Sequence, residues 1–196
     1  MNDILDMGGR VSLVTGAGQG VGAQIAKHLA AATNSGGVAV NDYFLERAEA
    51  VADAINAAGG KAVAVQADVS DHASVHAMVA KVEAALGPVG VLVNNAGNAG
   101  ANPHPDRTKP FWETDREVWD TTIGVNFYGV INCVGAVLPA MMKRQAPGRI
   151  ISIISDASRY GDAGMEIYSG AKAGAAGFMR SVARTMARHQ ITANNI

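Results

Sequence analysis

The stretch RVSLVTGAGQGVG, residues 10–22, gives the strongest indication of the fold. Its first part, Arg10–Thr15, is a short run of apolar and β-branched residues, which predicts a buried strand. Four glycines follow at alternate positions, and the apolar spacing after them predicts a helix over Val21–Ala32. Glycines allow a tight turn, and the start of a helix presents free N–H groups and the positive end of its dipole. The segment is therefore suited to hold an anion.

A strand, a glycine-rich loop and a helix in this order are what dinucleotide sites require, because the backbone must come close to the pyrophosphate. Glycines also occur in turns that have no ligand, so a structural turn is the alternative. We predict a dinucleotide site at this loop and assign to it Gly16, Gln19, Gly20, Val21 and Gly22.

After this stretch, strand-like and helix-like segments continue to alternate to the last residue. Strands are expected over residues 10–15, 38–42, 61–66, 89–94, 149–154 and 191–196. Helices are expected over 21–32, 45–58, from a cap at Ser70 to Leu86, from a capping box of Thr114 and Glu117 to about Lys143, and over 166–188. Such alternation implies right-handed crossovers. We therefore predict one α/β domain over residues 1–196, with a doubly wound parallel sheet of the Rossmann type between two helical layers.

The composition limits the class of partner. The formal net charge of −1 gives no basic field for nucleic acid or anionic membranes. The first residues lack the basic start of a signal peptide, and no uninterrupted apolar run approaches about 18 residues. The chain has one cysteine, Cys133, and its histidines lack metal-site spacing. We expect a cytoplasmic protein with no metal site and no nucleic-acid or membrane partner.

An acid at the end of the second expected strand bears on the choice of dinucleotide. At this position Asp42 would lie beside the adenosine ribose, accept hydrogen bonds from its hydroxyls and repel a 2′-phosphate. No Arg or Lys in the glycine loop offsets that repulsion, so NAD is favoured over NADP. A structural strand-end Asp is the alternative. Tyr43 follows and is a candidate for the adenine pocket, or else a packing aromatic.

Tyr168 and Lys172 are four residues apart in the last expected helix, which places them on one face. A free tyrosine has a pKa near 10, and a neighbouring ammonium group favours the phenolate and lowers that pKa. The two side chains therefore form a plausible proton-transfer pair. The spacing alone is weak evidence, since it recurs by chance on many helices.

The motifs together resemble those of the short-chain dehydrogenase/reductase family, in its NAD(P)-dependent branch. The resemblance covers the chain from about residue 8 and rests on motifs that occur in the family's order. These are Thr15-Gly16-x-x-x-Gly20-Val21-Gly22, Asp68-Val69, Asn94-Asn95-Ala96-Gly97, Asn126, Ser155 and Tyr168-x-x-x-Lys172.

The resemblance implies a role for each matching residue. Tyr168 would be the general acid/base, and Lys172 would lower its pKa and hold the nicotinamide ribose. Ser155, thirteen residues before Tyr168, would orient the substrate oxygen, and Asn126 would hold a water that links Lys172 to solvent. The remaining matches would line the cofactor cleft: Asp68, Val69, Asn95, Ala96 and Gly97. For Ser155 a capping role, and for Asn126 a purely structural one, remain alternatives.

Two departures from the family pattern matter. Residues 98–113 form a longer segment than most members have, and we expect it to be a solvated loop, a wall of the substrate mouth or a subunit contact. The sequence also ends at Ile196, where the family continues into a substrate-covering segment and a seventh strand, so we expect a chain that is incomplete at its C-terminus. The family further implies a homotetramer or homodimer through the helices bearing Asn126 and Tyr168.

The expected function is hydride transfer between NAD(H) and a secondary alcohol or ketone. Two alternatives stay open: a non-catalytic dinucleotide-binding or scaffold protein, and an NADP-dependent reductase of the 3-ketoacyl type. The sequence does not determine the substrate, because the fold does not fix it.

Overall fold

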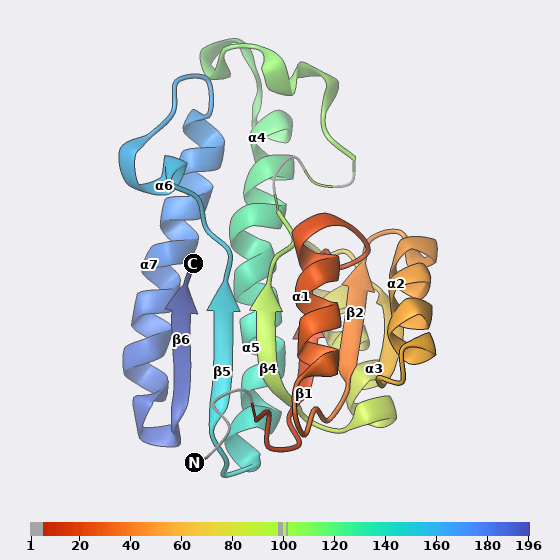
Figure 1. Ribbon diagram of the computed structural model, residues 1–196. Coiled ribbons are helices and arrows are strands. Elements are labelled where there is room, and N and C mark those ends of the chain that lie inside the picture. Colours follow the sequence, from red (N-terminus) through yellow and green to blue (C-terminus); the bar gives the residue numbers. More distant parts are fainter. Residues whose placement is uncertain (1–5, 98–99, 101) are drawn as a thin grey trace.

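A computed structural model describes residues 6–97, 100 and 102–196 (Figure 1). Six parallel strands form one sheet in the order β3-β2-β1-β4-β5-β6. The strands are β1 (Val11–Val14), β2 (Val38–Asp42), β3 (Ala62–Gln66), β4 (Val89–Asn94), β5 (Gly148–Ser152) and β6 (Ile191–Asn195). The predicted parallel, doubly wound α/β fold is confirmed, with strand ends shifted by two residues or fewer.

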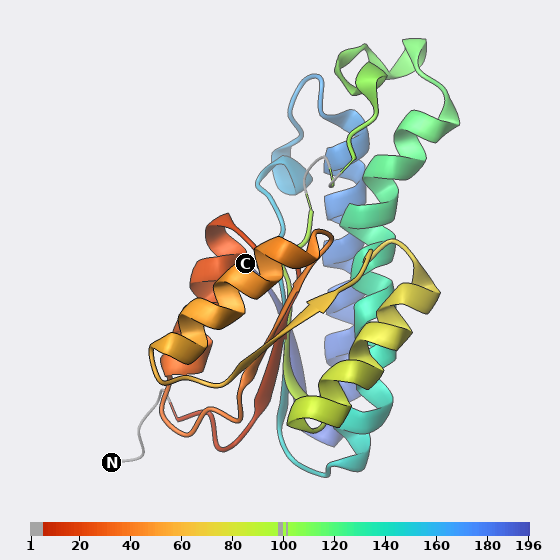
Figure 2. The same ribbon diagram turned by 90° about the vertical axis from the view of Figure 1, so that its right-hand side faces the viewer.

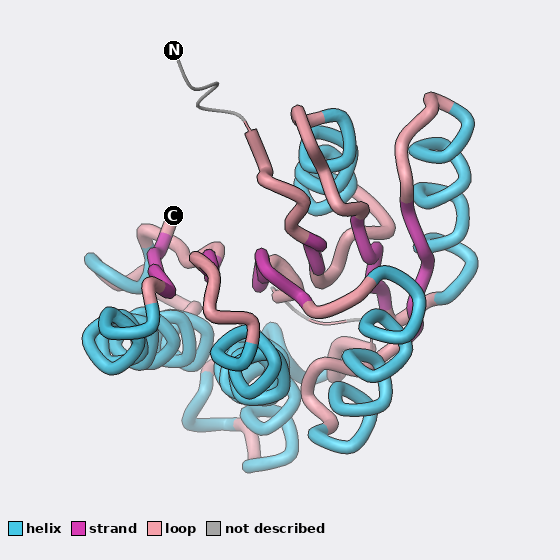
Figure 3. Tube along the Cα trace, turned by 90° about the horizontal axis from the view of Figure 1, so that it is seen from below, coloured by secondary structure: helices cyan, strands magenta, loops and turns pink. Residues whose placement is uncertain are grey.

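Helices cover both faces of this sheet, which gives the three layers expected (Figures 2 and 3). On one face lie α1 (Gly20–Ala31) and α2 (Leu45–Ala57). On the other lie α3 (His72–Leu86), α5 (Gly129–Lys143) and α7 (Glu166–Met186). A short helix, α6 (Ala157–Tyr160), and a 3₁₀ turn, η4 (Ala187–His189), complete the second half of the chain.

Each face of the sheet has its own core because successive strand residues point to opposite faces. In β1, Leu13 faces α3, α5 and α7, whereas Val14 faces α1 and α2, and both are fully buried. Cys133 is buried in the first of these cores, and burial raises the pKa of its thiol to about 12. It is therefore a packing residue, because a thiol with so high a pKa is a poor nucleophile.

We expect Leu13→Ala to lower the free energy of unfolding by about 3 kcal/mol, because it removes buried methyl groups and leaves a cavity in the larger core. Leu45→Ala is a matched control at a position that is 36% exposed, where a change within about 0.5 kcal/mol is expected. Urea unfolding of both variants measures the difference. Equal effects at the two positions would contradict the assignment of the core.

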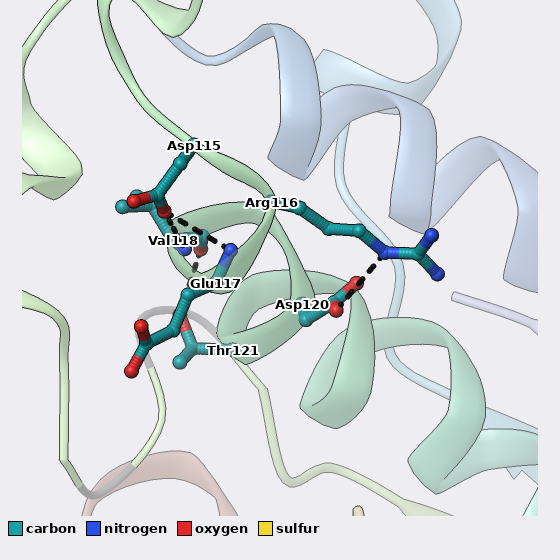
Figure 4. Close-up of polar contacts among 6 residues, drawn as sticks. All are labelled: Asp115, Arg116, Glu117, Val118, Asp120 and Thr121. Carbon is teal, nitrogen blue, oxygen red and sulfur yellow. Dashed lines mark hydrogen bonds and ion pairs between the residues drawn. The ribbon is translucent and has the colours of Figure 1, made fainter.

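Both predicted helix caps are wrong by one residue. Asp71, not Ser70, caps α3, with its carboxylate accepting a hydrogen bond from the N–H of Ser74 at 2.6 Å. Asp115, not Thr114, caps α4 (Arg116–Ile123) and accepts from the N–H groups of Glu117 and Val118 at 3.1 and 3.3 Å (Figure 4).

The reason for both errors is competition for the hydroxyl groups. Ser70 donates its hydroxyl to Asp68 at 2.6 Å. The hydroxyl of Thr114 donates to the carbonyl of Phe111 at 2.8 Å and accepts from the indole of Trp119, also at 2.8 Å. A free carboxylate one residue later therefore takes each capping position.

The long helix expected after Thr114 is present, but it is not uniform. Between α4 and α5 the five residues of η3 (Gly124–Tyr128) form a π-helical turn, and Asn126 lies within it. Such turns are rare and occur often at functional sites. The preceding segment, expected to be a loop, contains two 3₁₀ turns, η1 (Pro105–Thr108) and η2 (Phe111–Glu113). Of the expected loop, residues 98, 99 and 101 lie outside the described part of the chain.

One helical run in the described chain, Arg116–Lys143, is long and apolar enough to cross a membrane by length and composition alone, with a mean hydropathy of 1.5 over a stretch of 18 residues. Within the fold, its second half packs on the sheet through Val130, Val134, Val137 and Met141. A core helix passes the same test, so its apolar character is explained by this packing.

Candidate active site

A cleft of about 730 Å³ opens at the carboxyl ends of the strands. It lies where the strand order reverses between β1 and β4, which is where doubly wound sheets bind ligands. Its volume is within the range of small-molecule and cofactor sites. All the residues predicted to bind cofactor line it: Gly16, Gln19, Gly20, Val21, Gly22, Asp42, Tyr43, Asp68, Val69, Asn95, Ala96, Gly97, Tyr168 and Lys172.

The glycine loop forms one end of the cleft. Gly16 has a φ of +61°, and a Cβ atom on it would lie 2.8 Å from the Cα of Ala96, so a side chain is excluded on both grounds. Helix α1 starts at Gly20 with no side-chain hydrogen bond at its cap and no acid in its first turn. Its first N–H groups are therefore available to an anionic ligand, as a pyrophosphate requires.

Thr15 and Asn95 join this loop to the loop after β4. The hydroxyl of Thr15 accepts hydrogen bonds from the N–H groups of Asn95 and Ala96, both at 3.1 Å. The amide of Asn95 donates in return to the carbonyls of Thr15 and Gly16, both at 3.0 Å. Asn95 therefore fixes the shape of the cleft as well as lining it. Thr15 was quoted in the motif, but its role in holding two loops together was not anticipated.

Asp42 lies at the end of β2, where it was expected, and is 7% exposed. Its two carboxylate oxygens accept backbone N–H groups from Gly18 at 3.0 Å and from Phe44 at 3.1 Å. The acid thus also holds the glycine loop. Arg47 lines the cleft nearby, and a Cβ atom on Gly18 would touch both Asp42 and Arg47. Sequence reasoning missed this cation because it sought one only in the glycine loop, whereas Arg47 comes from α2.

The residues assigned to the adenine side also make hydrogen bonds and packing contacts within the protein. Asp68 accepts from the backbone N–H of Ser70 at 2.8 Å and from its hydroxyl, and so shapes the turn after β3. Val69 is 7% exposed and belongs to the larger core. Tyr43 is 38% exposed, and its hydroxyl accepts from the amide of Asn102 at 3.0 Å. These contacts keep the three residues in place beside the cleft.

Lys172 is the most unusual group in the cleft, because it is a lysine that is only 4% exposed. Its Nζ donates to the carbonyl of Ile153 at 2.9 Å and lies 5.9 Å from the ring centroid of Tyr168. Burial lowers the pKa of Lys172 from its ordinary 10.5 to about 8. The predicted pair is therefore together, with a desolvated ammonium group near the phenol.

Asn126 is fully buried in the π-helical turn, and its amide donates to the carbonyl of Thr122 at 2.9 Å. It does not line the cleft directly. A Cβ atom on Gly97 would lie 2.9 Å from both the Oδ1 of Asn126 and the Nζ of Lys172. The glycine thus allows the loop after β4 to pass close to these two polar groups.

Ser155 follows β5, as expected, but its hydroxyl oxygen accepts a hydrogen bond from the N–H of Ala157 at 3.2 Å. It does not line the cleft, although Ile153 and Ile154 just before it do. This hydrogen bond of Ser155 stabilises the turn before α6. Contact with a substrate would require its side chain to point toward Tyr168.

Among the described residues, no three His, Cys, Asp or Glu side chains are placed to hold a metal ion. The polar groups that gather at the carboxyl edge are those of the dinucleotide cleft and the Tyr168–Lys172 pair.

The comparison with known families agrees with this geometry. Residues 10–196 match the model of the short chain dehydrogenases. The chain belongs to this family. It is therefore an oxidoreductase by family, and the glycine loop and the cleft at the strand reversal fit a nicotinamide dinucleotide.

Individual members of the family are similar over nearly the whole chain. The 3-oxoacyl-[acyl-carrier-protein] reductase FabG of Staphylococcus aureus is 38% identical over 186 residues, which are 94% of this chain and 72% of that protein. A putative short-chain alcohol dehydrogenase of Sinorhizobium meliloti has a TM-score of 0.87 and 31% identity, over 98% of this chain and 73% of that one. A metagenomic short-chain oxidoreductase in complex with NADP has a TM-score of 0.82 and 34% identity, over 93% and 79% respectively.

Proposed function

We propose that this member of the family transfers hydride between NAD(H) and a secondary alcohol or ketone, with Tyr168 as the general acid/base. The observation that carries the proposal is the burial of Lys172 beside Tyr168 in the wall of the dinucleotide cleft. Burying a lysine costs free energy, and a buried ionisable group with a shifted pKa in a cleft is a candidate functional residue.

The cofactor, when bound, supplies or accepts the hydride. The protein supplies the proton. In ketone reduction Tyr168 donates its phenolic proton to the substrate oxygen, and in alcohol oxidation the phenolate takes that proton back. The ammonium of Lys172 stabilises the phenolate electrostatically, more strongly than in water because the site is desolvated.

The neighbouring residues position this pair. The carbonyl of Ile153 holds the Nζ of Lys172 through the 2.9 Å hydrogen bond. We assign to Asn126 the role of holding a water near Gly97 that connects the ammonium group of Lys172 with solvent. We assign to Ser155 the orientation of the substrate oxygen, which its hydroxyl would reach by exchanging the N–H of Ala157 for the substrate.

The proposed cofactor is NAD(H), since the Asp42 carboxylate would repel a 2′-phosphate. We expect NADH to bind at least about tenfold more tightly than NADPH, and the isosteric change Asp42→Asn to narrow that ratio by removing the charge. Titration of the nicotinamide fluorescence with both cofactors measures each affinity. Tighter binding of NADPH by the unmodified protein would reject this assignment.

A second candidate is an NADP-linked reductase of 3-oxoacyl thioesters. Two observations favour it. The FabG relative is named a 3-oxoacyl-[acyl-carrier-protein] reductase, and a structural neighbour was solved in complex with NADP. Arg47, which lines the cleft near Asp42, is the cation that would then bind the 2′-phosphate. In that case Arg47→Gln would weaken NADPH binding and leave NADH binding nearly unchanged.

Turnover separates both enzyme proposals from a non-catalytic dinucleotide-binding protein. The test is a panel of secondary alcohols with NAD, and of ketones and 3-oxoacyl thioesters with NADH and NADPH. Turnover of any of them supports catalysis, whereas binding of dinucleotide without turnover supports the non-catalytic alternative. Assembly through the helices bearing Asn126 and Tyr168 and a cytoplasmic location both stay predictions.

A further inference from the structure

A second hollow, of about 110 Å³, lies beside the cofactor cleft. It is lined by residues between 107 and 114, by helix α4 directly after them, and by the start of α7 with the turn before it, which lie much further along the chain. Figure 1 shows the loop and this turn standing beyond the carboxyl ends of the strands. The family pattern does not account for this hollow, because the loop is the segment in which this chain departs from it.

Tyr168 lines both the hollow and the cofactor cleft. A molecule whose oxygen meets the phenol in the cleft is therefore next to the hollow. The hollow is smaller than the roughly 150 Å³ cavity that accepts benzene, so it has room for a short side arm and not for a second ring system.

The lining of the hollow is part apolar and part polar, and its charged residues are here termed the rim. Val118 is 6% exposed and Trp119 is half-buried, so both keep water from part of the hollow. The rim carries two cations, Arg107 and Lys109, and one anion, Glu166.

The charged groups of the rim differ in how far they are neutralised. Lys109 is paired with Asp106 at 3.0 Å, and Glu166 accepts from the N–H of Gly164 at 3.1 Å. Arg107 has no ion pair or side-chain hydrogen bond with any described residue. It is therefore the rim cation that is free to bind an anionic ligand, and its planar group suits a carboxylate.

We propose that this hollow selects a substrate that bears a carboxylate on a short arm next to the reacting carbonyl or carbinol, with Arg107 as the residue that binds the carboxylate. The inference rests on the proposed function, since it takes Tyr168 as the group that meets the reacting oxygen. The carboxylate gains a charge-assisted hydrogen bond at the rim, while its methylene stem packs on Val118 and Trp119.

The test compares short keto acids, from 4-oxopentanoate to 7-oxooctanoate, with their methyl esters. We expect kcat/KM for at least one acid to exceed that of its ester by about tenfold, which corresponds to about 1.4 kcal/mol. Arg107→Gln should abolish this ratio and Glu166→Gln should increase it, because the two changes remove opposite charges. Arg184→Gln, at an exposed site near the far end of α7, is the control of equal charge and should leave the ratio unchanged.

Binding is measured separately through tryptophan fluorescence. The chain has two tryptophans, and Trp112→Phe removes the one that is 69% exposed, so that Trp119 alone reports on the hollow. Tighter binding of an acid than of its ester without any turnover would reject the proposed function and retain the carboxylate preference. If neutral ketones are turned over and the acid-to-ester ratio of kcat/KM is equal in all variants, the carboxylate inference is rejected and the proposed function stands. Failure of every keto acid to bind would reject it as well.

Discussion

Tyr168→Phe is expected to lower kcat for ketone reduction by about 10³-fold while the affinity for dinucleotide stays within about twofold. The substitution removes only the hydroxyl that exchanges a proton with the substrate. Hydride transfer then leaves an alkoxide without its proton donor, because phenylalanine has no hydroxyl to donate. The measurement is the initial rate with the best ketone of the panel, together with a cofactor titration.

Tyr160→Phe is the matched control. Tyr160 is 78% exposed on α6, has no lysine four positions later and lines neither the cleft nor the hollow. It should therefore retain full turnover. If Tyr168→Phe kept more than about a tenth of the parent rate, another group would have to be the acid/base, and the proposed mechanism would be wrong.

Lys172→Met is expected to make the protein more stable at pH 7 and nearly inactive. Burial lowers the pKa of Lys172 from 10.5 to about 8, which corresponds to a cost of about 3 kcal/mol for keeping the ammonium group charged in the folded state. The variant also loses the hydrogen bond from the charged ammonium group to the carbonyl of Ile153, worth about 2 kcal/mol. The net expectation is a gain of about 1 kcal/mol in the free energy of unfolding.

The sign of the pH dependence follows from the same pKa. Between about pH 8 and pH 10.5 the unfolded chain keeps the lysine proton and the folded protein releases it. Stability of the parent therefore gains from rising pH in this window, and below about pH 8 the full cost is present. The advantage of Lys172→Met should accordingly be largest near pH 7 and be lost by about pH 10.5.

Denaturant unfolding of parent and variant at several pH values measures this difference. Lys81→Met, at an exposed position of α3, is the control and should show no such window. A variant that is less stable than the parent at pH 7 would mean that the contacts of Lys172 outweigh its desolvation. The stability gain with loss of activity would identify Lys172 as a residue kept for function.

The fold and the position of the cofactor cleft could be predicted from the amino-acid sequence. The strand, the glycine loop and the helix of residues 10–22 are defined by local chemistry, and the alternation after them leaves few topologies because crossovers are right-handed. The carboxyl ends of parallel strands meet at one edge of the sheet. This is why Asp42, Asn95 and Lys172, remote in sequence, were placed correctly in one cleft.

The three-dimensional geometry of each turn, which sequence patterns do not give, settles which polar groups compete for the same partners. The caps of α3 and α4 went to Asp71 and Asp115 because neighbouring hydroxyls were already engaged. Ser155 took a backbone partner in its own turn. Such choices depend on distances that no periodicity encodes.

The tertiary structure also decided the surroundings of each charge. Arg47 of α2 lines the same cleft as Asp42 of β2, and the long loop brings Arg107 to a hollow shared with Tyr168. Sequence spacing placed Lys172 four residues from Tyr168, but packing buried it and lowered its pKa. Burial is set by what the whole chain packs around a group, so the chemistry of the site emerges only when the sheet and its helices are assembled.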